Sequence, residues 1–237
     1  MRAWKRAGPL TSIKLLPKST APTGARLRNM EEFLVTMALE IESQNRFEAA
    51  AIPVLYTGVG KINAAYSLTR ALMERRSAGL APPHVLNFGT AGSPKHRVGA
   101  LVACNRFVQL DMDASPLGFA PGHTPFDQAP AALEFPNRIA RLPLGTCGSA
   151  DTFQVNASAE RCDVLDMEAF ALAKVCWVER LQFTCVKYIT DGADHTAAVD
   201  WESNLPKAAA EFLEVYEELR HASQAGANAI GLSLIHI

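Results

Sequence analysis

The chain has 237 residues, of which 49% are hydrophobic and 20% charged, a composition typical of a globular protein with a sizeable core. Its formal net charge is -1, and no apolar run is long enough to span a bilayer, so neither nucleic acid nor a membrane is expected as a partner. The five cysteines lie far apart and form no CxxC pair, which favours reduced thiols in a cytoplasmic protein over a disulfide framework.

The two ends of the chain differ from its middle. Residues 1–29 contain seven basic side chains and no acidic one, as in an organellar transit peptide or in untranslated sequence before a true start at Met30. The second interpretation is favoured, because the segment that follows Met30 leads directly into a predicted strand. Residues 30–222 are predicted to form one domain, and the tail at 223–237 is expected to play no part in function.

Strands and helices are predicted to alternate along the middle of the chain. Strands are expected at 33–38, 51–60, 83–94, 100–112 and 183–194, and helices at 61–76, 163–181 and 206–222. On the first helix, Ile62, Ala65, Leu68 (or Thr69) and Leu72 are predicted to lie on one helical face. This alternation predicts an α/β sheet that is covered on both faces, with a ligand beyond the carboxyl ends of its strands.

Familiar catalytic motifs are absent. The "GVGK" stretch at 58–61 has Leu55 where a phosphate-binding loop needs glycine, and Ile62 where it needs serine or threonine. Asn63 stands where a dinucleotide fingerprint needs its third glycine. There is no HExxH or GxSxG motif, and the six histidines are scattered, so no metal site is expected.

Three acidic residues lie in apolar surroundings. Glu40 follows the first predicted strand, Glu168 lies in "DMEAF", and Asp191 ends the strand "FTCVKYIT". Each alone has an ordinary structural interpretation: a residue of a first helical turn, a carboxylate at a helix N-terminus, or a turn cap. Three of them at one edge of one sheet favour a shared function.

These residues lie within motifs that resemble the nucleoside phosphorylase/nucleosidase superfamily, and within it the 5′-methylthioadenosine/S-adenosylhomocysteine nucleosidases. The matching segments, in the family's order, are "MALE" (37–40), "TGVGKINAA" (57–65), "NFGTAGS" (87–93), "SADTF" (149–153), "DMEAFALAKVC" (166–176) and "VKYITDGAD" (186–194). The resemblance implies a nucleoside phosphorylase-like three-layer α/β/α sandwich with a central mixed sheet. It also implies hydrolysis of the bond between adenine and ribose, without a cofactor.

The resemblance assigns roles residue by residue. Glu40 would be the base that activates water, and Asp191 would serve N7 of the purine. Thr90 would help to place that water. Further substrate contacts would come from Gly92, Phe153 stacked on adenine, Met167 and Glu168 at the ribose, and Trp201 in the pocket wall. Glu168 is expected to stay ionised with help from the helix N-terminus, while burial should raise the pKa of Asp191 so that it can donate a proton.

Two other functions remain open at this point. A purine nucleoside phosphorylase would use phosphate instead of water, but Asn87 occupies a position where such enzymes usually have arginine, and Glu40 would repel phosphate. A catalytically silent nucleoside-binding protein would not need all three carboxylates. Lys187 stands where some family members have arginine. The Pro- and Gly-rich segment 110–130 is predicted to lie near the 5′ end of the substrate or at the contact of a homodimer.

Overall fold

The computed structural model describes residues 33–152, 161–192 and 197–233, so the predictions for residues 1–29 and for Phe153 lie outside the described residues. Eight strands form one sheet: β1 (Phe33–Met37), β2 (Val54–Tyr56), β3 (His84–Gly92), β4 (Leu101–Gln109), β5 (Ala132–Glu134), β6 (Leu144–Ser149), β7 (Val164–Asp166) and β8 (Phe183–Asp191). The helices are η2 (Glu40–Glu42), α2 (Arg46–Ala49), α3 (Lys61–Ser77), η3 (Ser115–Leu117), α4 (Ala169–Val178) and α5 (Ala197–Ser233).

The sheet is mixed, and part of it closes on itself. Strands β2, β1, β3 and β8 are parallel neighbours, as are β4, β6 and β7. Strand β8 also pairs antiparallel with β4, and β3 meets β7 antiparallel at Gly92 and Leu165. The pairings β3–β8–β4–β6–β7–β3 therefore form a closed circuit, with β1 and β2 extending from β3 and β5 extending from β4.

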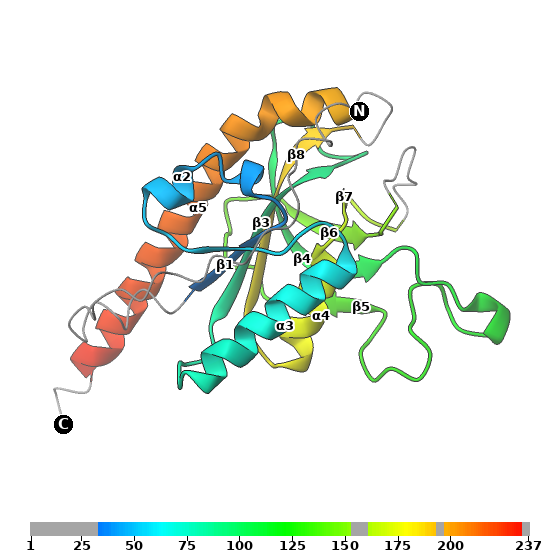
Figure 1. Cartoon of the computed structure of the whole chain (residues 1–237), viewed down its shortest axis with the longest axis horizontal. Helices are drawn as coiled ribbons and strands as arrows, with labels where there is room; N and C mark the ends of the chain where they lie inside the picture. The colour runs from blue at the N-terminus through cyan, green and yellow to red at the C-terminus, as the bar shows by residue number, and fades with distance from the viewer. Residues whose placement is uncertain (1–32, 153–160, 193–196, 234–237) are drawn as a thin grey trace.

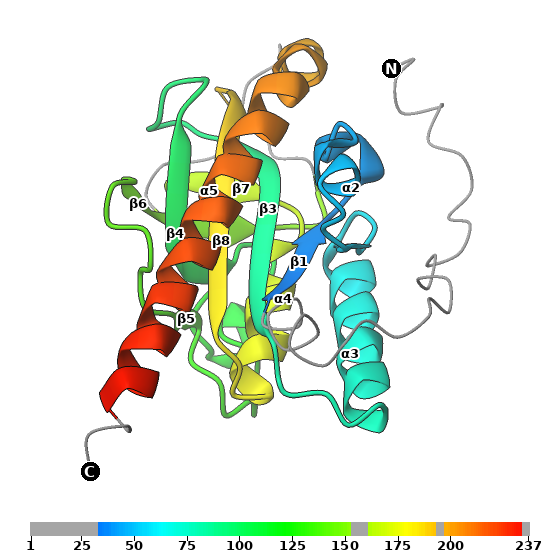
Figure 2. The same ribbon diagram turned by 90° about the vertical axis from the view of Figure 1, so that its left-hand side faces the viewer.

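Helices cover the sheet from two sides, which confirms the predicted three-layer architecture. Helices α3 and α4 pack together on one side, whereas α5 crosses β8 and β3 on the other (Figures 1 and 2). Alternate residues of β8 enter different cores, since Cys185 and Ile189 lie in the core under α3 and α4 and Val186 and Tyr188 lie in the core under α5. Lys187 lies between Val186 and Tyr188 and so shares the α4 side with Cys185.

All three predicted helices have different limits or faces from those expected. The helix predicted at 206–222 is longer at both ends, since α5 runs from Ala197 to Ser233 and has Pro206 inside it. The predicted helix at 163–181 begins only at Ala169, because Val164, Leu165 and Asp166 pair with β6 and form β7. This change leaves Glu168 as the N-cap residue of α4. On α3, Leu68 is buried, but Ile62, predicted to lie on the same face, is 80% exposed and Ala64 is buried instead.

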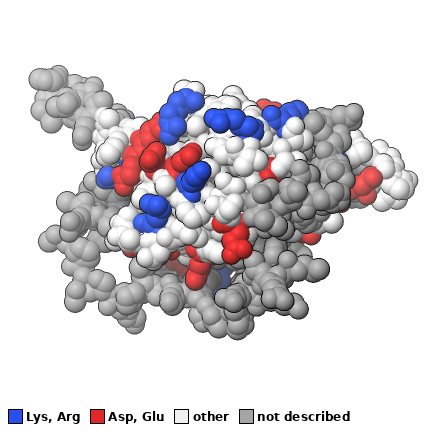
Figure 3. Space-filling model, turned by 90° about the horizontal axis from the view of Figure 1, so that it is seen from above, with Lys and Arg blue, Asp and Glu red and all other residues white. Residues whose placement is uncertain are grey.

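Two properties of the described residues bear on membrane and nucleic-acid partners. No helix in the ranges 33–152, 161–192 and 197–233 combines the length and the apolar character needed to cross a membrane. On the face seen in Figure 3, acidic and basic side chains lie interspersed, and neither sign of charge dominates. This face therefore shows no large patch of one charge sign that would attract a nucleic acid.

Candidate active site

A buried glutamate lies at the carboxyl end of β1. The short helix η2 turns the chain back, so that Glu42 Oε2 accepts hydrogen bonds from the backbone N–H groups of Ala38 and Leu39 at 3.0 and 3.1 Å. Its Oε1 accepts from the backbone N–H of Thr90 at 2.9 Å and from the Thr90 hydroxyl at 3.0 Å. Glu42 is 4% exposed, and its carboxylate joins the first strand to the third.

The structure does not bring Glu40 into this cluster. Glu40 begins η2 and is exposed, whereas Glu42, two residues later, occupies the buried position. The physical reason is the tight three-residue turn of η2, which rotates Glu40 outward and returns Glu42 to the strand end. The base role that the sequence assigned to Glu40 therefore has a better-placed candidate in Glu42.

Thr90 also contacts the C-terminal helix. The indole Nε1–H of Trp201, near the start of α5, donates to the Thr90 hydroxyl oxygen at 2.8 Å. Thr90 and Trp201, both predicted from the sequence as site residues, are thus in direct contact. Glu42, Thr90 and Trp201 form one connected group drawn from η2, β3 and α5.

A buried ion pair lies beside Glu42. Lys187 Nζ is 2.9 Å from Asp166 Oδ2, and both side chains are at most 2% exposed. Burial opposes both charges, but the Asp166 carboxylate raises the pKa of Lys187, and the Lys187 ammonium lowers the pKa of Asp166. Asp166 also accepts from the Ser149 hydroxyl at 2.5 Å and from the backbone N–H of Ala169 at 2.8 Å, so it fixes the start of α4.

A glycine in β3 leaves room for these charges. A Cβ atom at Gly89 would lie 2.9 Å from Lys187 Nζ and 3.5 Å from Glu42 Oε1. The first distance is too short for a real contact, so any side chain at position 89 would displace the ammonium group. Lys187 and Glu42 therefore approach β3 at the same point.

Glu168 lies close to this group and is held by one oxygen. Its Oε1 accepts a 2.7 Å hydrogen bond from the backbone N–H of Gly60. Burial, and then the nearby Asp166 carboxylate, raise the pKa of Glu168 to about 8. The structure thus runs against the expectation that Glu168 stays ionised, because burial opposes its charge more strongly than the helix N-terminus supports it.

The "GVGK" turn is fastened to other parts of the sheet edge. Gly60 has a φ of 93°, a conformation that L side chains rarely adopt, and its N–H faces Glu168. The next residue, Lys61, donates its backbone N–H to Asp151 at 2.8 Å, and its ammonium lies 2.6 Å from Asp111 and 3.0 Å from Asp151. The turn thus holds Glu168 and is itself held by two carboxylates.

The remaining predicted site residues lie at the same edge of the sheet. Asp191 is the last residue of β8, is 6% exposed, and accepts from the Thr190 hydroxyl at 2.8 Å. Gly92 pairs with Asp191 across β3 and β8, and Met167 is half-buried in the link between β7 and α4. Among the described residues, no group of three or more histidine, cysteine or acidic side chains could hold a metal ion.

Comparison with known protein families gives this geometry a context. A family profile described as "Phosphorylase superfamily" matches residues 44–225. The 5′-methylthioadenosine/S-adenosylhomocysteine nucleosidase of Marinomonas sp. is 30% identical over 186 residues, a match that covers 69% of this chain and 78% of the relative. The chain belongs to this nucleosidase family within the phosphorylase superfamily. The Geobacillus kaustophilus member of the family is 29% identical, with 83% of this chain and 90% of the relative covered.

Solved structures agree on the fold. A Helicobacter pylori nucleosidase determined with 5′-methylthioadenosine in its active site has a TM-score of 0.66 and 22% identity, covering 79% of this chain and 98% of that one. Futalosine hydrolase from the same organism also has a TM-score of 0.66 at 22% identity, covering 79% of this chain and 97% of that one. At this identity the likeness shows the fold alone, which is the nucleoside phosphorylase-like fold that the sequence predicted.

Proposed function

We propose that this protein hydrolyses the N-glycosidic bond of an adenine nucleoside such as 5′-methylthioadenosine or S-adenosylhomocysteine. The observation that carries the proposal is the buried Glu42 carboxylate, bonded to Thr90 at the carboxyl end of the parallel strands β1, β3 and β8. Membership of the nucleosidase family, whose named relatives act as nucleosidases, supports the substrate class.

Glu42 is proposed as the base that takes a proton from the attacking water. Cleavage of the glycosidic bond builds positive charge on the sugar, so a carboxylate beside the reacting carbon also stabilises the transition state electrostatically. General-base catalysis of this kind contributes about two to four decades in rate. The fixed backbone donors at Ala38, Leu39 and Thr90 hold the carboxylate without the reorganisation that mobile water would need.

Asp191 and Glu168 are proposed to act on the two halves of the nucleoside. Departing adenine gains negative charge, and Asp191 at the end of β8 would protonate or hydrogen-bond its N7. Glu168 is held at Gly60 through Oε1, which leaves Oε2 for the ribose hydroxyls. Met167 and Gly92 are proposed to line the sugar and water positions, Trp201 to stand in the wall, and Phe153 to stack on adenine.

Water is the proposed nucleophile because the described residues provide little for phosphate. Asn87 has a neutral amide, which is turned toward Thr36 and Cys185 at 3.3 Å from each and supplies no positive charge for phosphate. The nearby cation, Lys187, is already paired with Asp166. An anion at this place would also face the carboxylate of Glu42, which disfavours phosphorolysis.

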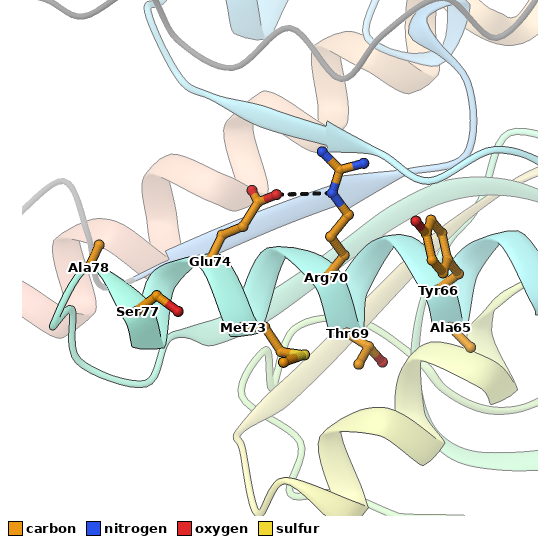
Figure 4. A pocket seen from close by; sticks show the side chains of 8 residues that line it. All are labelled: Ala65, Tyr66, Thr69, Arg70, Met73, Glu74, Ser77 and Ala78. Carbon is orange, nitrogen blue, oxygen red and sulfur yellow. Dashed lines mark hydrogen bonds and ion pairs between the residues drawn. The ribbon is translucent and has the colours of Figure 1, made fainter.

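A homodimer is proposed as the assembled form. The arm, residues 110–131 between β4 and β5, stands away from the sheet in Figure 1 and exposes Phe126 almost completely, at 93%. A shallow groove on α3 is lined by Ala65, Tyr66, Thr69, Arg70, Met73, Glu74, Ser77 and Ala78 (Figure 4). Tyr66 and Met73 are both exposed, as is Ile62 one turn earlier.

One chain thus offers an arm and a helix face that both expose large apolar side chains, and a second copy is the proposed occupant. Asp111 lies at the start of the arm, and its ion pair with Lys61 joins the arm to the "GVGK" turn. We therefore place the 5′ substituent of the nucleoside near the arm. A cytoplasmic location is proposed as well, because all five cysteines are free and buried.

Adenine release from 5′-methylthioadenosine by the purified protein tests the proposal. We expect equal rates with and without phosphate, and a free reducing sugar as the second product. A strict phosphate requirement with a sugar phosphate product would replace hydrolysis by phosphorolysis. Tight nucleoside binding without any adenine release would leave only a binding protein.

A further inference from the structure

Three side chains from three elements form a directed hydrogen-bond chain. Trp201 Nε1–H on α5 donates to the Thr90 hydroxyl oxygen at 2.8 Å, and the same hydroxyl lies 3.0 Å from Glu42 Oε1. An indole N–H can only donate, and an ionised carboxylate can only accept, so the Thr90 hydroxyl must accept from Trp201 and donate to Glu42. The chain therefore runs in one direction, from the C-terminal helix to the proposed base.

We propose that Trp201 is a positioning residue that keeps the Thr90 hydroxyl oxygen in place for the base Glu42. This inference rests on the proposed hydrolytic function and deepens it. The wall role that the family resemblance gives Trp201 requires only an aromatic ring, whereas this role requires the indole N–H.

The reason lies in which donors to Glu42 can move. Three of its four hydrogen bonds come from backbone N–H groups, of Ala38, Leu39 and Thr90, which are fixed by β1, η2 and β3. The Thr90 hydroxyl hydrogen alone among these four donors can rotate. When it turns from Glu42 to the oxygen of a bound water, it frees a lone pair on Glu42 for that water's proton.

During this exchange the Thr90 oxygen must not move. Threonine can place its hydroxyl in more than one χ1 rotamer, so the oxygen needs a second contact to stay beside Glu42. The Trp201 N–H supplies that contact and keeps donating whichever way the hydroxyl hydrogen points. Without it, the Thr90 oxygen would spend part of its time away from Glu42, and the fraction of productive complexes would fall.

A double-mutant cycle separates this role from a wall role. Trp201→Phe keeps an aromatic ring but loses the N–H, and Thr90→Val keeps the shape of Thr90 but loses the hydroxyl. We expect Trp201→Phe to lower kcat about three- to tenfold, the size of one lost neutral hydrogen bond, with less than about a twofold change in KM. In the Thr90→Val background, the same Trp201→Phe change should have no further effect on kcat.

Two results would overturn the role in positioning. Effects of Trp201→Phe and Thr90→Val that multiply in the double variant would show that Trp201 does not act through Thr90. A change confined to KM would assign Trp201 to the wall alone. Melting temperatures of all three variants identify any loss of activity that comes from unfolding.

A spectroscopic measurement tests the hydrogen bond without activity. The chain has three tryptophans, and the indole N–H resonance that disappears in Trp201→Phe belongs to Trp201. In Thr90→Val this resonance should move upfield, as an indole N–H does when it loses its acceptor. An unmoved resonance would overturn the proposal even in an active nucleosidase. A shifted resonance in a protein that releases no adenine would instead overturn the proposed function and, with it, the catalytic purpose of the chain.

Discussion

Glu42 and Thr90 are joined twice, since one carboxylate oxygen of Glu42 accepts from both the backbone N–H and the hydroxyl of Thr90 at 2.9 and 3.0 Å. Two bonds to one residue fix the carboxylate in position relative to β3 as well as β1. A general base must hold its acceptor oxygen within about 3 Å of the proton that it removes. These two hydrogen bonds are therefore the geometric basis for assigning the role of general base to Glu42 and not to the exposed Glu40.

The first prediction concerns how Glu168 makes the stability of the folded protein depend on pH. Burial raises the pKa of Glu168 to about 8 from its ordinary value of 4.5, so the folded protein holds a proton that the unfolded chain releases. This contribution to stability is complete below the unfolded pKa of 4.5 and is lost as the pH rises through the folded pKa of about 8. The slope is at most about 1.4 kcal/mol per pH unit.

Glu168→Gln should therefore flatten the fall in stability between pH 4.5 and about 8 and make the protein more stable at the upper end, while ribose binding weakens. Chemical denaturation across this pH range is the measurement. The exposed Glu134→Gln is the control and should leave the pH profile unchanged. A profile for Glu168→Gln that is identical to that of the unmodified protein would contradict the assigned protonation.

The second prediction concerns the buried ion pair. Lys187→Met leaves the Asp166 carboxylate buried without a counter-charge, which costs about 3–5 kcal/mol in comparable pairs. Lys95→Met removes the partner of Asp163 from a pair in which the lysine side chain is 46% exposed, and should cost less than about 1 kcal/mol. Urea unfolding of both variants gives the comparison. Equal losses would mean that Lys187 and Asp166 do not depend on each other in the folded protein.

The fold could be predicted from the sequence further than the site could. Strands β1, β3, β4 and β8 are apolar runs, three of which end in glycine or polar turn residues, and their limits were predicted within a few residues. Strand β6 was missed because Gly145 and Gly148 interrupt its pattern; a Cβ at either position would lie under 3 Å from a neighbouring side chain. Close approach between strands is a tertiary requirement, and local propensity does not encode it.

Thr90, Gly92 and Asp191 could be placed at one sheet edge because each lies at or near the end of a predicted strand. Met167 and Glu168 could be placed there only through the family resemblance, since β7, the strand that they follow, lies within a predicted helix. Glu42 could not be distinguished from Glu40, since both follow the same strand and only the path of η2 decides which one is buried. One sequence feature favours Glu42: it follows Ala38 by four residues, so one tight turn can bring its carboxylate back to the backbone N–H of Ala38. Asp166 was missed because the predicted helix included it, whereas pairing with β6 makes it a strand residue.

The third prediction tests the leaving-group role of Asp191. Asparagine can donate a hydrogen bond to N7 of adenine but cannot supply a proton, so Asp191→Asn should slow adenine nucleoside hydrolysis by about two to four decades. A nitrophenyl riboside departs as a stable anion and should be cleaved almost as fast by the variant as by the unmodified enzyme. Steady-state rates on both substrates, with the melting temperature, decide the matter. Parallel losses on both substrates in a folded variant would give Asp191 another role.

The fourth prediction tests the homodimer. Placing a charge at the groove on α3 with Met73→Asp should shift sedimentation from dimer toward monomer, because a buried carboxylate without a partner opposes association. Val98→Asp replaces an exposed apolar residue that belongs neither to the arm nor to the groove and should leave the dimer intact. An unmodified protein that sediments as an active monomer would contradict the proposed assembly.

The most direct test of the central claim compares Glu42→Gln with Glu40→Gln in adenine release from 5′-methylthioadenosine without phosphate. The two residues lie in the same short helix and the two changes are chemically identical, so only their positions differ. Glu42→Gln should reduce kcat by about two to four decades because it removes the general base. Glu40→Gln should stay within about threefold of the unmodified enzyme, as a surface substitution away from the site. A folded Glu42→Gln variant with near-normal kcat, or a comparable loss in Glu40→Gln, would contradict the account.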